Sequence, residues 1–302
     1  MAVREGLAEH RHGRNTLRAL RLLGVLLLYR AEAYAIDIEP GIYTARAPGK
    51  NALGLYVQHV ERNARYADGE KLSGDVTLDS NSLQMRFLHY LEYRGRTVAP
   101  GFIASCGVTR AGSDIAGLGT ARGCADPIVG TVFWVRNRPQ EKRYLAVTPY
   151  LSVPVGNYDK DRSLNLGENR WKIGVNSGVI MPLPGKFLLD LVGDVVGHSA
   201  NDEYLGDHRL EQRVLVNAQI HLRYQIDPAT RVSASYLHDW GGETSVDGID
   251  QQNTKNQGRY RIGAARYLNP RHQLQLEVGA DSHVENGFRE SARFIVRYVW
   301  LD

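Results

Sequence analysis

Long stretches of this 302-residue sequence alternate between apolar and polar side chains. In residues 214–226 every even-numbered side chain is apolar, and all the odd-numbered ones except Leu215 are polar. Successive side chains of a β-strand point to opposite faces, so this alternation predicts strands with one apolar face. The other stretches predicted as strands are 52–63, 82–95, 97–107, 127–136, 143–155, 171–181, 187–195, 232–240, 260–268, 274–280 and 292–300.

The connections between these twelve strands are alternately long and short. The short ones carry residues that favour tight turns, namely Gly, Pro, Asn or Asp, and are 94–96, 137–142, 182–185, 227–230 and 269–271. The long, polar ones are 64–81, 108–126, 156–168, 199–211, 241–257 and 282–289. Many strands reach the roughly 9 to 11 residues that a tilted strand needs to cross a bilayer. The pattern predicts an all-β, up-and-down antiparallel transmembrane β-barrel of the outer-membrane type with about 12 strands.

Composition and residue placement exclude other folds. No apolar run approaches the roughly 18 residues of a membrane helix. A soluble β-sandwich or lipocalin-like barrel would turn its apolar faces inward, and the charges on the second faces leave little apolar surface for such an interior.

The two cysteines, Cys106 and Cys124, fit one disulfide formed in an oxidising compartment. Aromatic residues near the strand ends predict two membrane-interface girdles, an outer one of Trp171, Trp240 and Tyr260 and an inner one of Phe187, Tyr224, Tyr298 and Trp300.

The first 35 residues have the layout of a secretory signal peptide. An arginine-rich start precedes the apolar run 22–29 and the exit Ala33-Tyr34-Ala35, so cleavage is predicted after Ala35; a buried N-terminal helix is the alternative. This segment holds six Arg and three Glu of a chain with net charge +4, so cleavage leaves a nearly neutral protein and no basis for nucleic-acid binding. The predicted parts are a signal peptide (1–35), a periplasmic segment or plug (36–51) and the barrel (52–302), in the outer membrane of a Gram-negative cell.

Assigning the apolar faces to lipid places charged residues on the inner faces of seven neighbouring strands, with the sign alternating from strand to strand. Two interpretations stay open. The charges can pair across strands and stiffen the wall, each solvated pair contributing about 0.2 to 1 kcal/mol. They can instead form a selectivity constriction that orients a polar solute. This charge ladder consists of Lys172, Asp190, Asp194, Arg223, Asp239, Arg259, Arg261, Glu277, Asp281, Arg293 and Arg297.

Signals for chemistry are weak, and we expect no enzymatic activity, no cofactor and no metal site. Asp190, Asp194 and His198 share a strand face, but at about 3.3 Å per residue they are too far apart to share one ion. Residues 157–168 space their oxygen-bearing side chains as a calcium loop does. However, Arg162 stands where the tight turn needs glycine, and no helices flank the loop. We therefore predict a solvated, internally paired external loop.

Several of these segments resemble the outer-membrane family named for the meta-pathway of phenol degradation. They are VPVGNYDKDRSLNLGENRWK, GKFLLDLVGDV, HLRYQIDPATRVSASYLHDWGGET and QLQLEVGADSHVENGFRESARFIVRY. The likeness is strong over about 125–298 and looser over 53–108. It implies passage of aromatic or other small hydrophobic compounds across the outer membrane and carries over no catalytic residues. The chain departs from the family by ending Trp300-Leu301-Asp302, two residues beyond the aromatic that usually serves as an assembly signal.

Together the pattern and the resemblance predict a monomeric channel for passive passage of small, aromatic or hydrophobic solutes linked to aromatic-compound degradation. The expected partners are outer-membrane lipid, the small-molecule solute and the barrel assembly machinery. Two alternatives stay open. One is a non-conducting structural or surface-interaction barrel whose loops bind a partner, and the other is an outer-membrane hydrolase whose catalytic residues meet across strands.

Overall fold

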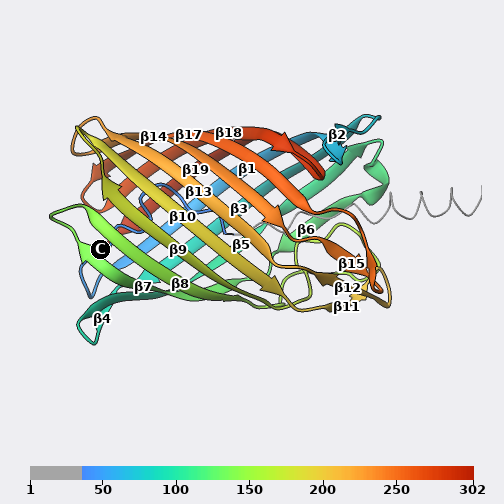
Figure 1. The fold of residues 1–302 in the computed structure, drawn as a ribbon, viewed down its shortest axis with the longest axis horizontal. Coiled ribbons are helices and arrows are strands. Elements are labelled where there is room, and N and C mark those ends of the chain that lie inside the picture. Colours follow the sequence, from blue (N-terminus) through green and yellow to red (C-terminus); the bar gives the residue numbers. More distant parts are fainter. Residues whose placement is uncertain (1–35) are drawn as a thin grey trace, which may run out of the picture.

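The computed structural model describes residues 36–302, which form a closed antiparallel β-barrel (Figure 1). Each wall strand pairs with the next and the last pairs with the first, with Ala52 opposite Leu301, so the predicted barrel of twelve strands is confirmed. The wall strands are β1 (Asn51–Ala67), β3 (Val76–His89), β5 (Arg96–Ser113), β7 (Ile128–Arg138), β8 (Arg143–Ser152), β9 (Lys172–Pro182), β10 (Phe187–His198), β13 (Leu215–Gln225), β14 (Thr230–Gly241), β17 (Lys255–Asn269), β18 (His272–Val284) and β19 (Gly287–Leu301).

The two ends of the barrel differ in how the strands are joined (Figure 1). Short turns, the hairpin strand β4 (Leu91–Tyr93) and the C-terminus lie at one end, which we call the short-turn end. Longer connections gather at the opposite, long-loop end, where four small strands form a separate sheet. The small elements at the long-loop end are β2 (Glu70–Lys71), η1 (Ala116–Leu118), β6 (Thr120–Cys124), β11 (Asn201–Tyr204), β12 (His208–Gln212), β15 (Thr244–Val246) and β16 (Ile249–Asp250).

The wall is apolar on the outside and polar on the inside. Outward-facing Ile262 and Leu276 are 59% and 50% exposed, whereas inward-facing Asp190 and Asp239 are buried. A soluble sandwich or barrel would show the reverse arrangement, so that alternative is wrong. Lipid suits this exterior, as in outer-membrane barrels. Within residues 36–302 no helix is long and apolar enough to cross a membrane, and the predicted signal peptide, 1–35, lies outside the described residues.

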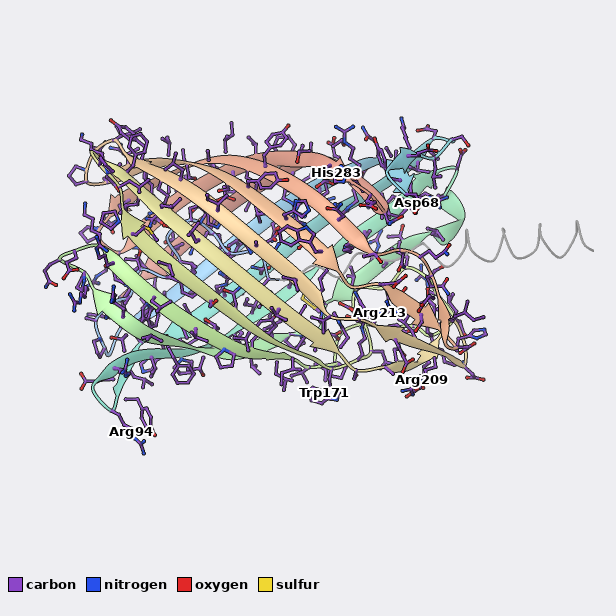
Figure 2. The ribbon with its side chains drawn as sticks, viewed as in Figure 1. Asp68, Arg94, Trp171, Arg209, Arg213 and His283 are labelled. Carbon is purple, nitrogen blue, oxygen red and sulfur yellow. A yellow bond between two sulfur atoms is a disulfide. The ribbon has the colours of Figure 1, made fainter. Side chains whose placement is uncertain are left out.

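Aromatic side chains lie outside the wall toward both ends. Trp171 points away from the barrel toward the long-loop end (Figure 2), and Trp240 and Tyr260 are exposed as well. Near the short-turn end, the ring centroids of Phe187 and Tyr224 on adjacent strands lie 4.9 Å apart. These positions match the two girdles that the sequence predicts at the membrane interfaces.

Side-chain caps and glycines hold the short turns. Between β13 and β14, the N–H groups of Ala229 and Thr230 donate to Asp227 Oδ1 at 2.8 and 2.9 Å. These bonds favour the ionised carboxylate and so lower the pKa of Asp227 below its usual range. Gly95 and Gly185 have φ of 72° and 73°, a conformation that side chains with a Cβ rarely adopt.

Some strands extend further toward the long-loop end than predicted. The strand expected at 82–95 is shifted to β3, and the expected connection 282–289 is reduced to a tight turn between β18 and β19. In this part of β3 the pattern inverts, because Val76 and Leu78 face inward and are buried while the outward side chains are polar. A search for apolar side chains facing lipid misses such a strand, since its outer face lies in water and its inner face packs against loops.

Candidate functional site

The segment 36–50 lies inside the barrel, and we call it the lumen segment. It forms no strand there, and side chains of the wall bond several of its backbone groups, while others bond within the segment or to the backbone of Tyr90. The N–H of Ile36 donates to Asp194 Oδ2 at 2.9 Å, and the N–H of Gly41 donates to Asp190 Oδ2 at 2.7 Å. Gln219 bonds the segment twice, accepting from the N–H of residue 38 at 3.0 Å and donating to the carbonyl of residue 36 at 2.9 Å. Two carboxylates of the predicted charge ladder therefore accept hydrogen bonds from the backbone of this segment.

Two carboxylates of the lumen segment pair with arginines of the wall. Glu39 Oε2 lies 2.7 Å from Arg86 Nη1, and both side chains are at most 10% exposed. Asp37 lies between Arg259, at 3.4 Å, and Arg261. Removing one partner of a buried ion pair leaves an uncompensated charge, so these contacts fix the segment strongly.

Tyr43 anchors the lumen segment against the opposite wall. Its hydroxyl donates to Asn176 Oδ1, and its backbone carbonyl accepts from Trp134 Nε1 at 2.8 Å. The ring lies over Gly178, where a Cβ would stand 2.2 Å from Tyr43 Cδ2. Only glycine at position 178 allows this approach. Tyr43 also belongs to the largest buried apolar cluster, with Trp134 and side chains of several other strands.

The predicted charge ladder lies on the inner face of the wall, and all its members except Lys172 are buried. Two cross-strand ion pairs form within the ladder. Arg223 Nη2 lies 2.6 Å from Asp190 Oδ1, between β13 and β10, and Arg259 Nη2 lies 2.7 Å from Asp239 Oδ2, between β17 and β14. The charges thus neutralise one another where neighbouring strands bring opposite signs together.

Other ladder residues bind groups outside the ladder. Lys172 lies 2.5 Å from Glu168, and Arg293 lies 2.5 Å from Glu290. The remaining partners are the Tyr150 hydroxyl for Asp194 at 3.0 Å, Gln257 for Asp281 at 2.9 Å, and Gln275 for both Glu277 and Arg297, the latter at 3.2 Å. Sequence reasoning missed Asp37, Glu39, Arg86, Tyr150 and Glu290. The alternation Ile36-Asp37-Ile38-Glu39 is the signal that could have found the first two.

An apolar cluster of loop and strand side chains lies inside the barrel at the long-loop end. Leu164 and Phe288 are 2% and 1% exposed and pack with Val76, Leu78 and Ile115. Leu164 belongs to the loop expected at 156–168, so this otherwise solvated loop is anchored by a buried leucine that the prediction did not include. The apolar pair Leu164 and Leu166 within that polar stretch was the available signal.

The same loop is paired internally around Asn165. The Asn165 amide donates to the carbonyls of Asp159 and Arg162 at 3.0 and 2.7 Å, and its Oδ1 accepts from the N–H of Asp159 at 2.8 Å. Within residues 36–302 no three His, Cys, Asp or Glu side chains gather closely enough to hold a metal ion.

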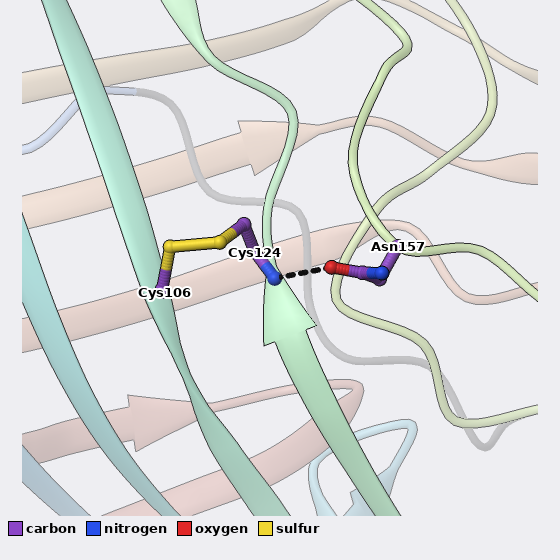
Figure 3. Close-up of a disulfide and its surroundings, with 3 residues drawn as sticks. All are labelled: Cys106, Cys124 and Asn157. Carbon is purple, nitrogen blue, oxygen red and sulfur yellow. Dashed lines mark hydrogen bonds between the residues drawn. A yellow bond between two sulfur atoms is a disulfide. The ribbon is translucent and has the colours of Figure 1, made fainter.

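A disulfide between Cys106 and Cys124 joins β5 to β6 at the long-loop end (Figure 3). The N–H of Cys124 also donates to Asn157 Oδ1 at 2.7 Å. Asn157 lies so close to Gly123 that a Cβ there would meet its Oδ1 at 2.1 Å. The second and third long loops are therefore fixed to each other.

A closed antiparallel barrel with an apolar exterior, aromatic girdles and a charged interior defines an outer-membrane β-barrel protein. The chain belongs to the family described as "Putative MetA-pathway of phenol degradation", whose profile matches residues 62–298. The resemblance seen in the sequence is therefore confirmed. No curated protein matches this chain in sequence.

Solved structures share this fold to different degrees. The COG4313 outer membrane channel from Pseudomonas putida F1 matches with a TM-score of 0.84 and 35% identity, over 88% of this chain and 100% of that one. The β domain of the Bordetella autotransporter BrkA matches with a TM-score of 0.50 and 10% identity, over 83% of this chain and 98% of that one. The transport unit of the Escherichia coli autotransporter AIDA-I also gives 0.50, with 9% identity over 93% and 96%. The last two show a common fold alone.

Proposed function

We propose that this protein is a non-enzymatic outer-membrane channel through which small aromatic or other hydrophobic solutes pass passively. The observation that carries the proposal is the likeness to the Pseudomonas putida channel over that protein's whole length at 35% identity. The family's description supports a link to the degradation of aromatic compounds.

We further propose that the lumen segment is the gate of this channel and that the conformation described above is closed. Glu39 bound to Arg86 and Asp37 bound to Arg259 hold the segment across the lumen. The apolar cluster around Leu164 and Phe288 closes the long-loop end. Passage requires both closures to move, so the wild-type channel should open rarely.

Single-channel recording in planar bilayers tests this proposal with the variant Glu39→Gln. Removing the carboxylate leaves Arg86 buried without its counter-charge, a loss of about 3 to 5 kcal/mol for a broken buried pair. Since 1.4 kcal/mol is a factor of ten, the open probability should rise about a hundredfold or more.

The matched control is Glu141→Gln, whose carboxylate pairs with Arg138 at 2.9 Å on the exposed surface of a short turn. This variant should record like the wild type. The absence of conductance steps in both wild type and Glu39→Gln, together with no liposome uptake of phenol, would contradict the channel.

The small sheet of β11, β12, β15 and β16 favours the second candidate, a non-conducting barrel whose external loops bind a partner. This sheet projects beyond the wall and carries exposed charges, including the pair Arg209 and Asp202. Figure 2 shows Arg209 and Arg213 at this end of the molecule. The conductance experiment separates the two candidates, because a binding barrel of this kind passes no current.

A further inference from the structure

A cavity of about 530 Å³ lies at the short-turn end of the lumen, beneath the lumen segment. Its walls come from residues 41–50 of the segment, from the adjacent ends of the wall strands and from the C-terminal residues 299–302. We call it the basic cavity. Its volume lies within the range of small-molecule binding sites, about 300 to 1,000 Å³.

The basic cavity holds an excess of positive charge. Two of its arginines are neutralised, since Arg86 pairs with Glu39 and Arg223 pairs with Asp190. Among the lining residues the one carboxylate side chain is Asp302, which bonds to Asn51 instead. Five further cations line the cavity with no carboxylate of residues 36–302 within 4.0 Å, namely Arg46, Lys50, Lys142, Arg231 and Arg297.

Arg297 is the most deeply buried of these five cations. It is 7% exposed, and its guanidinium carbon lies 5.3 Å from the centre of the Tyr56 ring. Its Nη1 donates to Gln275 Oε1 at 3.2 Å, while its buried Nε has no hydrogen-bond partner. Gln273 also lines the cavity, and its buried amide nitrogen has no hydrogen-bond partner either. Unpaired buried donors of this kind favour binding of an anion.

Much of the remaining cavity wall is apolar or phenolic. Tyr90, Tyr144 and Tyr267 line it together with Leu88 and Ile180. Such a wall leaves a bare inorganic ion without contacts over most of its surface but suits an aryl or short alkyl group. A guanidinium group in turn holds a carboxylate with two parallel hydrogen bonds.

We propose that the basic cavity binds a small organic carboxylate, with the carboxylate on Arg297 and Arg231 and the aryl or alkyl body against the tyrosine and leucine side chains. Arg231 already reaches into the interior, donating to the carbonyl of Pro40 at 3.2 Å. This inference rests on the proposed channel function, of which it names the solute class.

Equilibrium dialysis of the full chain folded in detergent tests the inference, with radiolabelled benzoate as the probe. Wild type should bind benzoate saturably. Arg297→Gln and Arg231→Gln should each weaken binding about tenfold or more, as expected for loss of a charged hydrogen-bond partner. Arg297→Lys should bind with intermediate affinity, because it keeps the charge but loses the planar fork.

The matched control is Arg94→Gln. Figure 2 shows Arg94 at the tip of the hairpin beyond the wall, and Arg94 is not among the residues that line the cavity. This variant should therefore bind as the wild type does. If Arg297→Gln fails to fold, Arg231→Gln serves in its place, because Arg231 makes no ion pair within residues 36–302 and carries the carboxylate in this proposal. Weaker benzoate binding by Arg231→Gln supports the inference, and unchanged binding overturns it.

Three results would overturn the proposal. Equal binding by wild type and Arg297→Gln would show that the Arg297 guanidinium does not bind the ligand. Phenol bound as tightly as benzoate would show that the site does not recognise a carboxylate. Displacement of benzoate by inorganic phosphate at equal concentration would show that the site does not recognise the organic body. The binding measurement does not depend on transport, so the two proposals can fail separately. Benzoate binding by a barrel that passes no current would refute the channel and support the ligand proposed for the cavity. Conduction without benzoate binding would support the channel and refute the ligand.

Discussion

At the scale of single residues, the interior of the barrel depends on glycines that admit tyrosine rings. Gly178 lies under the ring of Tyr43, and Gly174 lies where a Cβ would stand 2.2 Å from Tyr150 Cζ. The sequence places both glycines on the polar face of a strand, because that follows from alternation alone. It does not show that tyrosine rings fill the space above them, since Tyr43 comes from a segment more than a hundred positions away and Tyr150 from the neighbouring strand β8.

Gly178→Ala should weaken closure by the lumen segment. The added methyl group overlaps the ring of Tyr43, so the tyrosine must move and its bond to Asn176 is lost, at a cost of about 1 to 3 kcal/mol. Single-channel open probability should rise accordingly. Gly193→Ala is the matched control, because a Cβ there meets no atom within 4 Å. Identical recordings from both variants would show that Tyr43 does not hold the gate.

At the scale of elements, alternation identifies the strands well where their outer face meets lipid and poorly where it meets water. The predicted strand 214–226 corresponds closely to β13, but β3 begins six residues earlier than its predicted strand at 82 because its pattern inverts beyond the membrane. The buried leucine of the third long loop was missed for a related reason. The charges of this loop are visible in the sequence, whereas the burial of Leu164 depends on which loops lie beside it.

Leu164→Ala should loosen the third long loop without affecting the wall. The substitution removes a side chain that is 2% exposed, and such truncations cost about 2 to 5 kcal/mol of packing free energy. Limited proteolysis followed by mass spectrometry should show faster cleavage within 156–168. Leu183→Ala, in an exposed short turn, provides the comparison and should leave the cleavage rate of that loop unchanged. Equal rates in the two variants would argue against docking through Leu164.

At the scale of the whole molecule, the wall closes through backbone pairing between the first and last strands. Leu55 lies opposite Tyr298 and His59 opposite Phe294, so β1 and β19 pair along most of their length. The lumen segment precedes β1 and contributes no strand to this wall. The backbone pairing that closes the wall therefore does not involve the lumen segment.

Deletion of residues 36–45 should leave the barrel folded and conducting. The β-sheet circular dichroism and the slower migration of the heated protein in gel electrophoresis should persist, because the β1–β19 pairing is intact. Conductance per opening should increase, since the segment no longer crosses the lumen. A deletion variant that cannot fold would mean that the wall needs the segment's ion pairs, for example Glu39 with Arg86, to offset its own buried charges.

The sequence by itself determined the strand number, the up-and-down order, the lipid-facing residues and the inner positions of the charge ladder, because each follows from local alternation and turn chemistry. Only the tertiary structure decided which partners the charges take. Asp190 and Asp194 bind backbone groups of the lumen segment as well as their neighbours, and Arg297 lines a cavity whose one carboxylate side chain, Asp302, bonds to Asn51. Barrel closure brings these groups together from segments far apart in the chain. The alternation of side chains is a local pattern and therefore does not predict contacts between such segments.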